Sequence, residues 1–181
     1  IPKVFVPALD KQYFTLDMWL PEGTRIEETD KMVMDMAEYI RGQEETEMVS
    51  TYIGRTPPRY YLSNVSFGPQ SNYAQILMKC KTSKLSRQLH ARLQDSVSLR
   101  FPEPLIKVNK FELSPLTEAV IEARFLGPDP AVLDSLVGQA IEIMRQNPKV
   151  SDARNEWGNM SMVIRPVYDP VKAGALGITK A

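Results

Sequence analysis

The feature that most constrains the fold is a change of hydrophobic period near the start of the chain. Apolar side chains occupy every second position from Phe14 to Leu20, which is the pattern of a strand with one buried face. Pro21 cannot donate to a strand ladder and Gly23 readily adopts turn dihedrals, so the strand is predicted to end there. Beyond this turn, core-type positions follow the i, i+3, i+4, i+7 spacing of a helix, which Gly42 would cap. These positions are Thr29, Met32, Val33, Met36, Ala37 and Ile40.

Three more strands and a second helix are predicted downstream. The strands are expected at residues 48–53, 73–81 and 105–113. Ser83 is suited to cap a helix with one apolar stripe. The stripe consists of Leu85, Leu89, Leu93 and Val97. The resulting β-α-β-β-α-β order over residues 14–113 predicts an α+β fold, a ferredoxin-like sandwich with both helices on one side of the sheet.

A second, incomplete unit follows, so residues 1–113 and 114–181 are predicted to be separate subdomains. Asp129 before Pro130 is a strong helix start, and the Asn147-Pro148 pair should end that helix. Strands are expected at residues 119–126, 150–154 and 161–167, and a further helix could begin at Thr179. This βαβ order is half of the first fold, and its open sheet edge needs a partner strand. We therefore expect a piece of a larger protein, whose half sheet is poorly ordered or pairs with another chain when isolated.

Composition excludes several classes of function. Basic and acidic residues balance at 22 each, which argues against a nucleic-acid partner because such proteins present a basic face. One cysteine cannot form an intramolecular disulfide framework or a multi-cysteine metal site. The sequence has no glycine-rich phosphate loop and no nucleophile–base arrangement, so it predicts neither an enzyme nor a cofactor. Cys80 is interpreted as a buried hydrophobe and His90 as a helix-surface residue, and most of the nine methionines as core filling.

The segment between the second and third predicted strands, residues 54–72, is much longer than the usual hairpin loop of about 2–5 residues. It is rich in proline, serine and asparagine and also carries arginines and aromatic residues. Two interpretations remain open, a functional loop or a flap whose aromatic rings cover the core. The candidate binding residues of this loop are Arg55, Arg59, Tyr60, Tyr61 and Phe67.

Several short motifs identify a family. They are Phe5-Val-Pro-Ala-Leu-Asp10, Leu20-Pro-Glu-Gly-Thr24, Arg154-Asn-Glu-Trp-Gly158, Arg165-Pro-Val-Tyr-Asp169 and Ala175-Leu-Gly-Ile-Thr179. In order and spacing the chain resembles the periplasmic porter region of resistance–nodulation–division (RND) efflux transporters of the AcrB-like family. The matching segment of those transporters follows the seventh transmembrane helix.

The resemblance implies a role in a proton-driven exporter of drugs or other amphiphiles, seated in the bacterial inner membrane. Residues 1–113 would be the first C-terminal porter subdomain in the periplasm, and residues 114–181 half of the second. Substrates would enter through a cleft between the two, with residues 54–72 at the position of the family's switch loop. The parent protein would be a homotrimer that works with a periplasmic adaptor and an outer-membrane channel. The cleft positions implied by the resemblance are Thr15, Asp17, Glu112 and Arg154.

Strand alternation adds one residue to this set and limits an alternative. Trp19 shares a strand face with Asp17, opposite to the core-facing Leu16 and Met18, and an exposed indole beside a carboxylate suits an amphiphilic or cationic molecule. A second interpretation stays open, in which Trp19 packs on the adjacent subdomain and Asp17 is simply solvated. A heavy-metal exporter would need a methionine cluster, whereas Met18 is predicted to face the core. A free-standing ferredoxin-like binding module is a further alternative, since the residues alone do not require a transporter.

Overall fold

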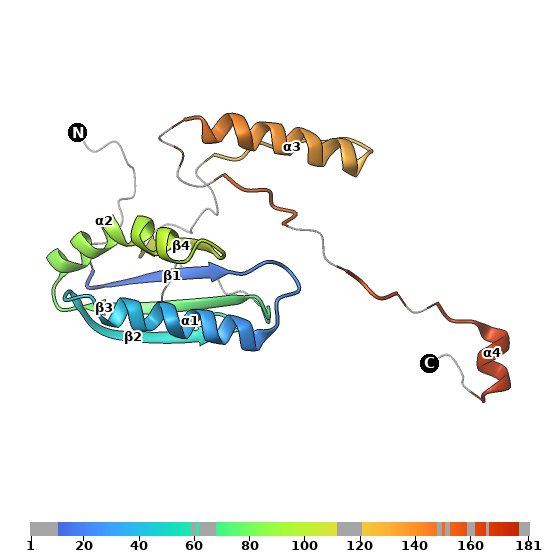
Figure 1. Cartoon of the computed structure of the whole chain (residues 1–181), viewed down its shortest axis with the longest axis horizontal. Helices are drawn as coiled ribbons and strands as arrows, with labels where there is room; N and C mark the ends of the chain where they lie inside the picture. The colour runs from blue at the N-terminus through green and yellow to red at the C-terminus, as the bar shows by residue number, and fades with distance from the viewer. Residues whose placement is uncertain are drawn as a thin grey trace.

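The first region of the protein contains the six predicted elements in the predicted order. The computed structural model describes residues 11–58, 61, 68–111, 121–147, 150, 153–158, 162–165 and 167–177. The elements of the first region are β1 (Tyr13–Trp19), α1 (Ile26–Arg41), β2 (Thr46–Ile53), β3 (Tyr73–Cys80), α2 (Ser83–Arg100) and β4 (Leu105–Lys110). Figure 1 shows the sheet with α1 and α2 lying across it.

The four strands form one antiparallel sheet in the order β2-β3-β1-β4. β1 is therefore a central strand, paired with β3 on one side and with β4 on the other. In the register, Asp17 lies opposite both Gln75 of β3 and Lys107 of β4. This topology confirms the prediction of an α+β, ferredoxin-like sandwich.

The hydrophobic core lies between one face of this sheet and the two helices. It takes alternate residues of β1, such as Leu16 and Met18, together with the i, i+3, i+4 stripe of each helix. Fully buried members are Phe14, Leu16, Met18, Val33, Met36, Ala37, Ile40, Ala74, Ile76, Met78, Cys80, Leu89, Leu93 and Val97. The core position of Cys80 and most of both predicted stripes are thus confirmed, although Met32 of the first stripe and Leu85 of the second are only partly buried.

Element ends differ from the predictions in small ways. The cap of α2 is Thr82, whose hydroxyl accepts a hydrogen bond from the Leu85 amide at 3.2 Å, and the predicted Ser83 is the first helical residue. Gly42 follows α1 with φ −69°, a right-handed conformation open to any residue. β4 ends at Lys110, so the predicted strand 105–113 is shorter, and residues 112–113 lie outside the described part of the chain.

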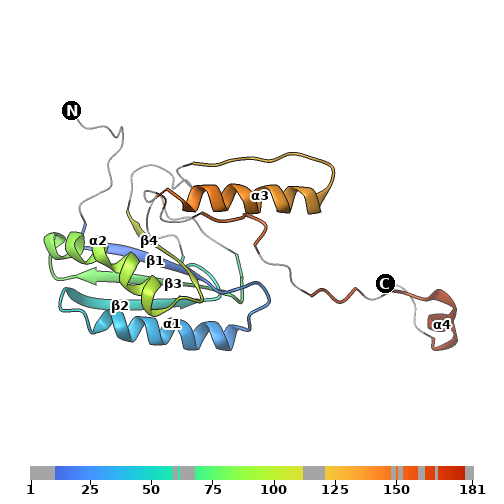
Figure 2. The same ribbon diagram turned by 45° about the horizontal axis from the view of Figure 1, so that its top comes forward.

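The second unit keeps its predicted helix, α3 (Pro130–Arg145). Asp129 caps it by accepting a hydrogen bond from the Ala131 amide at 2.9 Å, as predicted, and Gln146 follows as the C-cap. No residue of α3 is fully buried, and its apolar Val132 is 54% exposed. Figure 2 shows α3 apart from α1 and α2, beyond β4.

The strands predicted for the second unit are wrong wherever the structure describes them. Residues 121–126, 150, 153–154, 162–165 and 167 are not in strand conformation. A strand is stabilised by its ladder, and the sheet that the described residues form, β2-β3-β1-β4, includes none of these segments. The rest of those predicted strands, together with Thr179, lies outside the described residues. A short helix, α4 (Pro170–Ala175), was not predicted, although Asp169 before Pro170 repeats the start signal of α3.

Candidate functional site

The candidate site begins on the sheet face opposite the helices. Because side chains alternate along β1, Thr15, Asp17 and Trp19 project to this face while Leu16 and Met18 enter the core. The prediction that Asp17 and Trp19 lie on the face opposite to Leu16 and Met18 is confirmed. An exposed Asp17 was also expected, and this is wrong.

Asp17 is buried, with only 6% of its surface exposed. Its Oδ1 accepts hydrogen bonds from the Tyr73 hydroxyl at 2.6 Å and from Nε2 of Gln75 at 2.8 Å. Its Oδ2 accepts a hydrogen bond from Nδ2 of Asn109 at 2.7 Å. The three donors come from both neighbouring strands and take the place of water around the carboxylate. The side chain thus ties β1 to β3 and to β4 at one point.

Burial sets the ionisation of this carboxyl group. Removal from water raises the pKa of Asp17 above its ordinary value of 3.8, because the charged form loses hydration. The hydrogen bonds from Tyr73, Gln75 and Asn109 and the charge of Lys107 act in the opposite direction without cancelling that rise. Protonation of Asp17 is therefore easier in the folded protein than in a solvated chain.

Gln75 brings an unusual feature to the same network. It is 2% exposed, and while its Nε2 donates to Asp17, its Oε1 has no hydrogen-bond partner within the described part of the chain. A buried amide oxygen without a donor is uncommon, since leaving such a group unpaired costs about 1–3 kcal/mol.

Trp19 lies at the end of this face, between the two units of the chain. Its ring packs on Tyr73, with centroids 5.3 Å apart and planes tilted by 44°. The guanidinium carbon of Arg154 lies 5.7 Å from the centre of the same ring, within the range of a cation–π contact. Two residues predicted for the site from separate stretches of sequence are therefore in contact.

A tight turn positions Arg154. The Asn155 side chain accepts a hydrogen bond from the Trp157 amide at 3.0 Å, and the Gly158 amide donates to the Asn155 carbonyl at 3.2 Å. Gly158 has φ +65°, which favours glycine because other residues are strained in that conformation. The Asn155 amide also donates to Asp134 of α3 at 3.2 Å. The Asn-Glu-Trp-Gly sequence thus folds into a compact turn immediately after the arginine.

The remaining predicted site residues are only partly brought together. Thr15 is 5% exposed and so belongs to the buried face. Tyr61 packs on Phe111 just beyond β4, with ring centroids 4.8 Å apart, which favours a covering role for this part of the loop. Arg55 is exposed. The other predicted residues lie outside the described part of the chain; they are Arg59, Tyr60, Phe67 and Glu112.

Sequence reasoning missed Tyr73, Gln75, Asn109 and Phe111. A usable signal was present on β3, where Tyr73 and Gln75 alternate with the apolar Ala74 and Ile76. Two large polar side chains opposite a core face mark a second face that is itself covered. Their hydrogen bonds to β1 depend on strand register, which the sequence alone left open.

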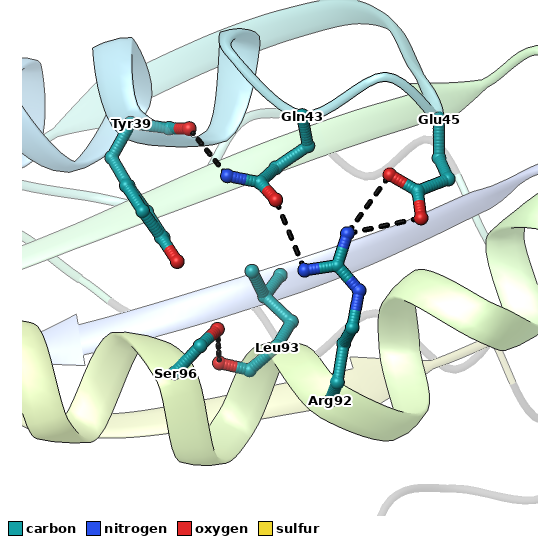
Figure 3. A network of polar contacts seen from close by, with 6 residues as sticks. All are labelled: Tyr39, Gln43, Glu45, Arg92, Leu93 and Ser96. Atoms are coloured by element: carbon teal, nitrogen blue, oxygen red, sulfur yellow. Dashed lines mark hydrogen bonds and ion pairs between the residues drawn. The ribbon is translucent and has the colours of Figure 1, made fainter.

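Arg92 forms a second polar network on the helix side of the sheet (Figure 3). Its guanidinium donates to Oε1 of Gln43 at 3.0 Å and to both carboxylate oxygens of Glu45 at 2.9 Å. The Gln43 amide in turn donates to the Tyr39 carbonyl at 3.1 Å. The hydrogen bond from Arg92 lowers the pKa of the Glu45 carboxyl group. This network joins α2 to the turn between α1 and β2 and is structural.

Two further side chains singled out by sequence are also structural. His90 is half-buried against Phe14 with ring centroids 5.5 Å apart, and burial lowers its pKa. The Cys80 thiol is fully buried, which raises its pKa and suppresses the reactive thiolate. Met18 lies in the core, as predicted. Within the described residues, no three His, Cys, Asp or Glu side chains gather as a metal site.

The first region is a ferredoxin-like α+β domain. This class is defined by its βαββαβ order, its β2-β3-β1-β4 sheet and the position of both helices on one face of that sheet. The sequence model of the AcrB/AcrD/AcrF family matches residues 1–181, so the chain belongs to this family of RND efflux transporters. No individual curated protein matches the chain.

Family membership has direct consequences. Members are transporters and not enzymes, they sit in the inner membrane, and the family implies tripartite efflux pumps. Among the helices that the structure describes, none combines the length and apolarity required to cross a membrane. The family assignment favours the exporter over the free-standing module.

Proposed function

We propose that this chain forms part of the periplasmic substrate path of a proton-driven RND pump. The path admits drugs or other amphiphiles through a cleft between two porter subdomains, residues 1–113 and 114–181. The parent pump is a homotrimer that works with a periplasmic adaptor and an outer-membrane channel. Family membership supports the exporter, and the contact of Arg154 with Trp19 supports the location of the path.

The chemistry of this contact suits an amphiphile. Trp19 offers a large apolar ring that is half-buried, and an aromatic ring with a polar N–H group suits contact with an amphiphile. Arg154 supplies an exposed charged group beside it, and Tyr73 fixes the ring from within the sheet. Asp17, Tyr73 and Gln75 hold this end of the face rigid through their hydrogen bonds. The buried Thr15 and Asp17 therefore shape the wall of the cleft, while Trp19 touches the substrate.

The test is an export profile of the whole transporter. Trp19→Ala is expected to change which dyes, detergents and antibiotics are exported, at an unchanged amount of protein in the membrane. Trp157→Ala is the matched control, because Trp157 is the only other tryptophan and is 59% exposed. Identical profiles for wild type and Trp19→Ala across the panel would remove Trp19 from the substrate path.

A further inference from the structure

The two edges of the sheet differ in how well they could accept a further strand. Within the part of the chain that the structure describes, β2 and β4 each have one neighbouring strand, so their outer backbone groups face away from the sheet. Such groups are a template for another strand. The register of β2 is irregular between Thr46 and Met48, which disturbs that template. β4 pairs with β1 in an unbroken register, so its outer edge is the more regular of the two.

A side chain of α2 occupies the middle of the β4 edge. The Val108 amide donates to Oε1 of Gln94 at 2.9 Å, and Nε2 of Gln94 donates to the Ile106 carbonyl at 3.0 Å. Nε2 also donates to the Ser98 hydroxyl of its own helix at 3.3 Å. A carboxamide carries the same donor and acceptor groups as a peptide unit. Gln94 therefore makes with β4 the two kinds of bond that a neighbouring strand would make.

The same bonds show that this edge is complementary to itself. Because backbone groups alternate in direction along a strand, those of Ile106, Val108 and Lys110 face outward. A second β4, related by a twofold axis at Val108, would run antiparallel and present the same outward groups to the first. Lys107 would then lie opposite Asn109 of the other copy. Lys110 would lie opposite Ile106, so no two like charges would be directly opposed.

We propose that the outer edge of β4 is an interface for a second copy of this chain and that Gln94 keeps this interface closed. Before two β4 edges can pair, each copy has to give up both hydrogen bonds between Gln94 and its own strand. The new backbone bonds would largely replace bonds that already exist, so pairing gains little while the amide is in place. Without the amide, the two sheets could continue into one.

The experiment measures self-association of the full 181-residue chain by sedimentation equilibrium. Gln94→Met keeps a side chain of similar length and helix propensity but removes the amide. Since two hydrogen bonds per copy no longer oppose pairing, this variant is expected to associate at least about tenfold more tightly than wild type. Association as weak as that of wild type, with an unchanged circular dichroism spectrum, would overturn the proposal.

Two further variants separate the loss of the amide from a general increase in surface apolarity. Gln88→Met makes the same exchange at an exposed position of the same helix and should associate as wild type does. Gln94→Asn stays polar, but its amide is one methylene group too short to meet both backbone groups, so it should associate as Gln94→Met does. Gln94→Asn also decides the question if Gln94→Met does not fold. Equal tightening in Gln88→Met, or none in a folded Gln94→Asn, would refute the role of Gln94.

Amide hydrogen exchange by NMR locates the contact. At low protein concentration the Val108 amide should exchange about two- to tenfold faster in Gln94→Met than in wild type, because it has lost its acceptor. At high concentration, pairing with a second β4 should slow it again. The Lys107 amide belongs to the β1 side of the strand and should exchange equally in both proteins. Tighter association without this renewed protection of Val108 would place the contact elsewhere, such as the exposed apolar side chains of α3, and would contradict the proposal.

Discussion

The hydrogen bond between Tyr73 and Asp17 can be tested by removing one oxygen atom. Tyr73→Phe keeps the buried ring and deletes the hydroxyl that donates to Oδ1 of Asp17 at 2.6 Å. The carboxylate keeps two donors, Gln75 and Asn109, so it is under-satisfied but not stranded. A buried hydrogen bond to a charged group contributes about 1.5–3 kcal/mol, and a neutral one about 1 kcal/mol. The variant should lose about 1.5–3 kcal/mol of unfolding free energy at alkaline pH, where Asp17 is ionised.

The penalty of Tyr73→Phe should shrink as the pH falls. Burial raises the pKa of Asp17, so its carboxyl group becomes protonated in the folded state at a higher pH than in the unfolded chain. Once it is protonated, the lost hydrogen bond is neutral and the cost falls to about 1 kcal/mol. Urea unfolding of the 181-residue chain, followed by circular dichroism at a series of pH values, measures how the penalty changes with pH.

A double-mutant cycle with Asp17→Asn assigns the effect to the pair. In the Asn background, Tyr73→Phe removes only a neutral hydrogen bond, so its cost should be about 1 kcal/mol at every pH. The reasoning would be refuted by a penalty of Tyr73→Phe that is independent of pH in the wild-type background. Equal penalties in the Asp and Asn backgrounds at alkaline pH would refute it too.

Four further outcomes follow from the same contacts. The pKa of Asp17 is higher in the folded state than its ordinary value of 3.8, so at a pH between the unfolded-state and folded-state pKa the folded protein binds more protons than the unfolded chain. The unfolding free energy of wild type relative to Asp17→Asn should therefore fall as the pH rises through that window. A flat or rising difference would contradict the raised pKa. Leu16→Ala should cost about 2–5 kcal/mol in urea unfolding, since the side chain is fully buried in the core, and a loss below about 1 kcal/mol would mean that the site collapses. Thr82→Ala should cost about 0.5–2 kcal/mol by removing the cap of α2, whereas Ser83→Ala should be close to neutral; the reverse order would restore Ser83 as the cap. The Cys80 thiol should resist alkylation by iodoacetamide at pH 8 in the folded chain and react fully in urea, and rapid reaction without urea would show that this core position is open.

Local sequence patterns were sufficient for the first domain because each element carries its own signal. The period-2 run in β1 and the helical stripe of α1 do not depend on knowing their partners. The same holds for α3, whose Asp129-Pro130 start satisfies the first amide groups from within the helix. α4 has the same Asp-Pro start and could have been found from it.

The strands of the second unit and the burial of Asp17 could not be predicted in this way. An apolar run such as residues 162–165 has strand character, but a strand forms only where another backbone completes the ladder. Asp17 was expected on an exposed face because alternation shows which face a side chain takes and not what lies over it. Its burial depends on Tyr73 and Asn109, which lie 56 and 92 positions further along the chain.

The central position of β1 in the sheet has a consequence for how the protein is made. Asp17 and Asn109 are 92 residues apart, so at about 5–20 residues per second β4 leaves the ribosome roughly 5–18 s after β1. β3 is synthesised before β4, and until β3 has been made, both backbone edges of β1 are unpaired and its apolar face lacks its sheet partners. Late closure of this kind slows folding and exposes the strand to pairing with other chains. Substitutions that delay the docking of β4 should therefore lower the yield of folded protein during synthesis more than they lower its stability once formed.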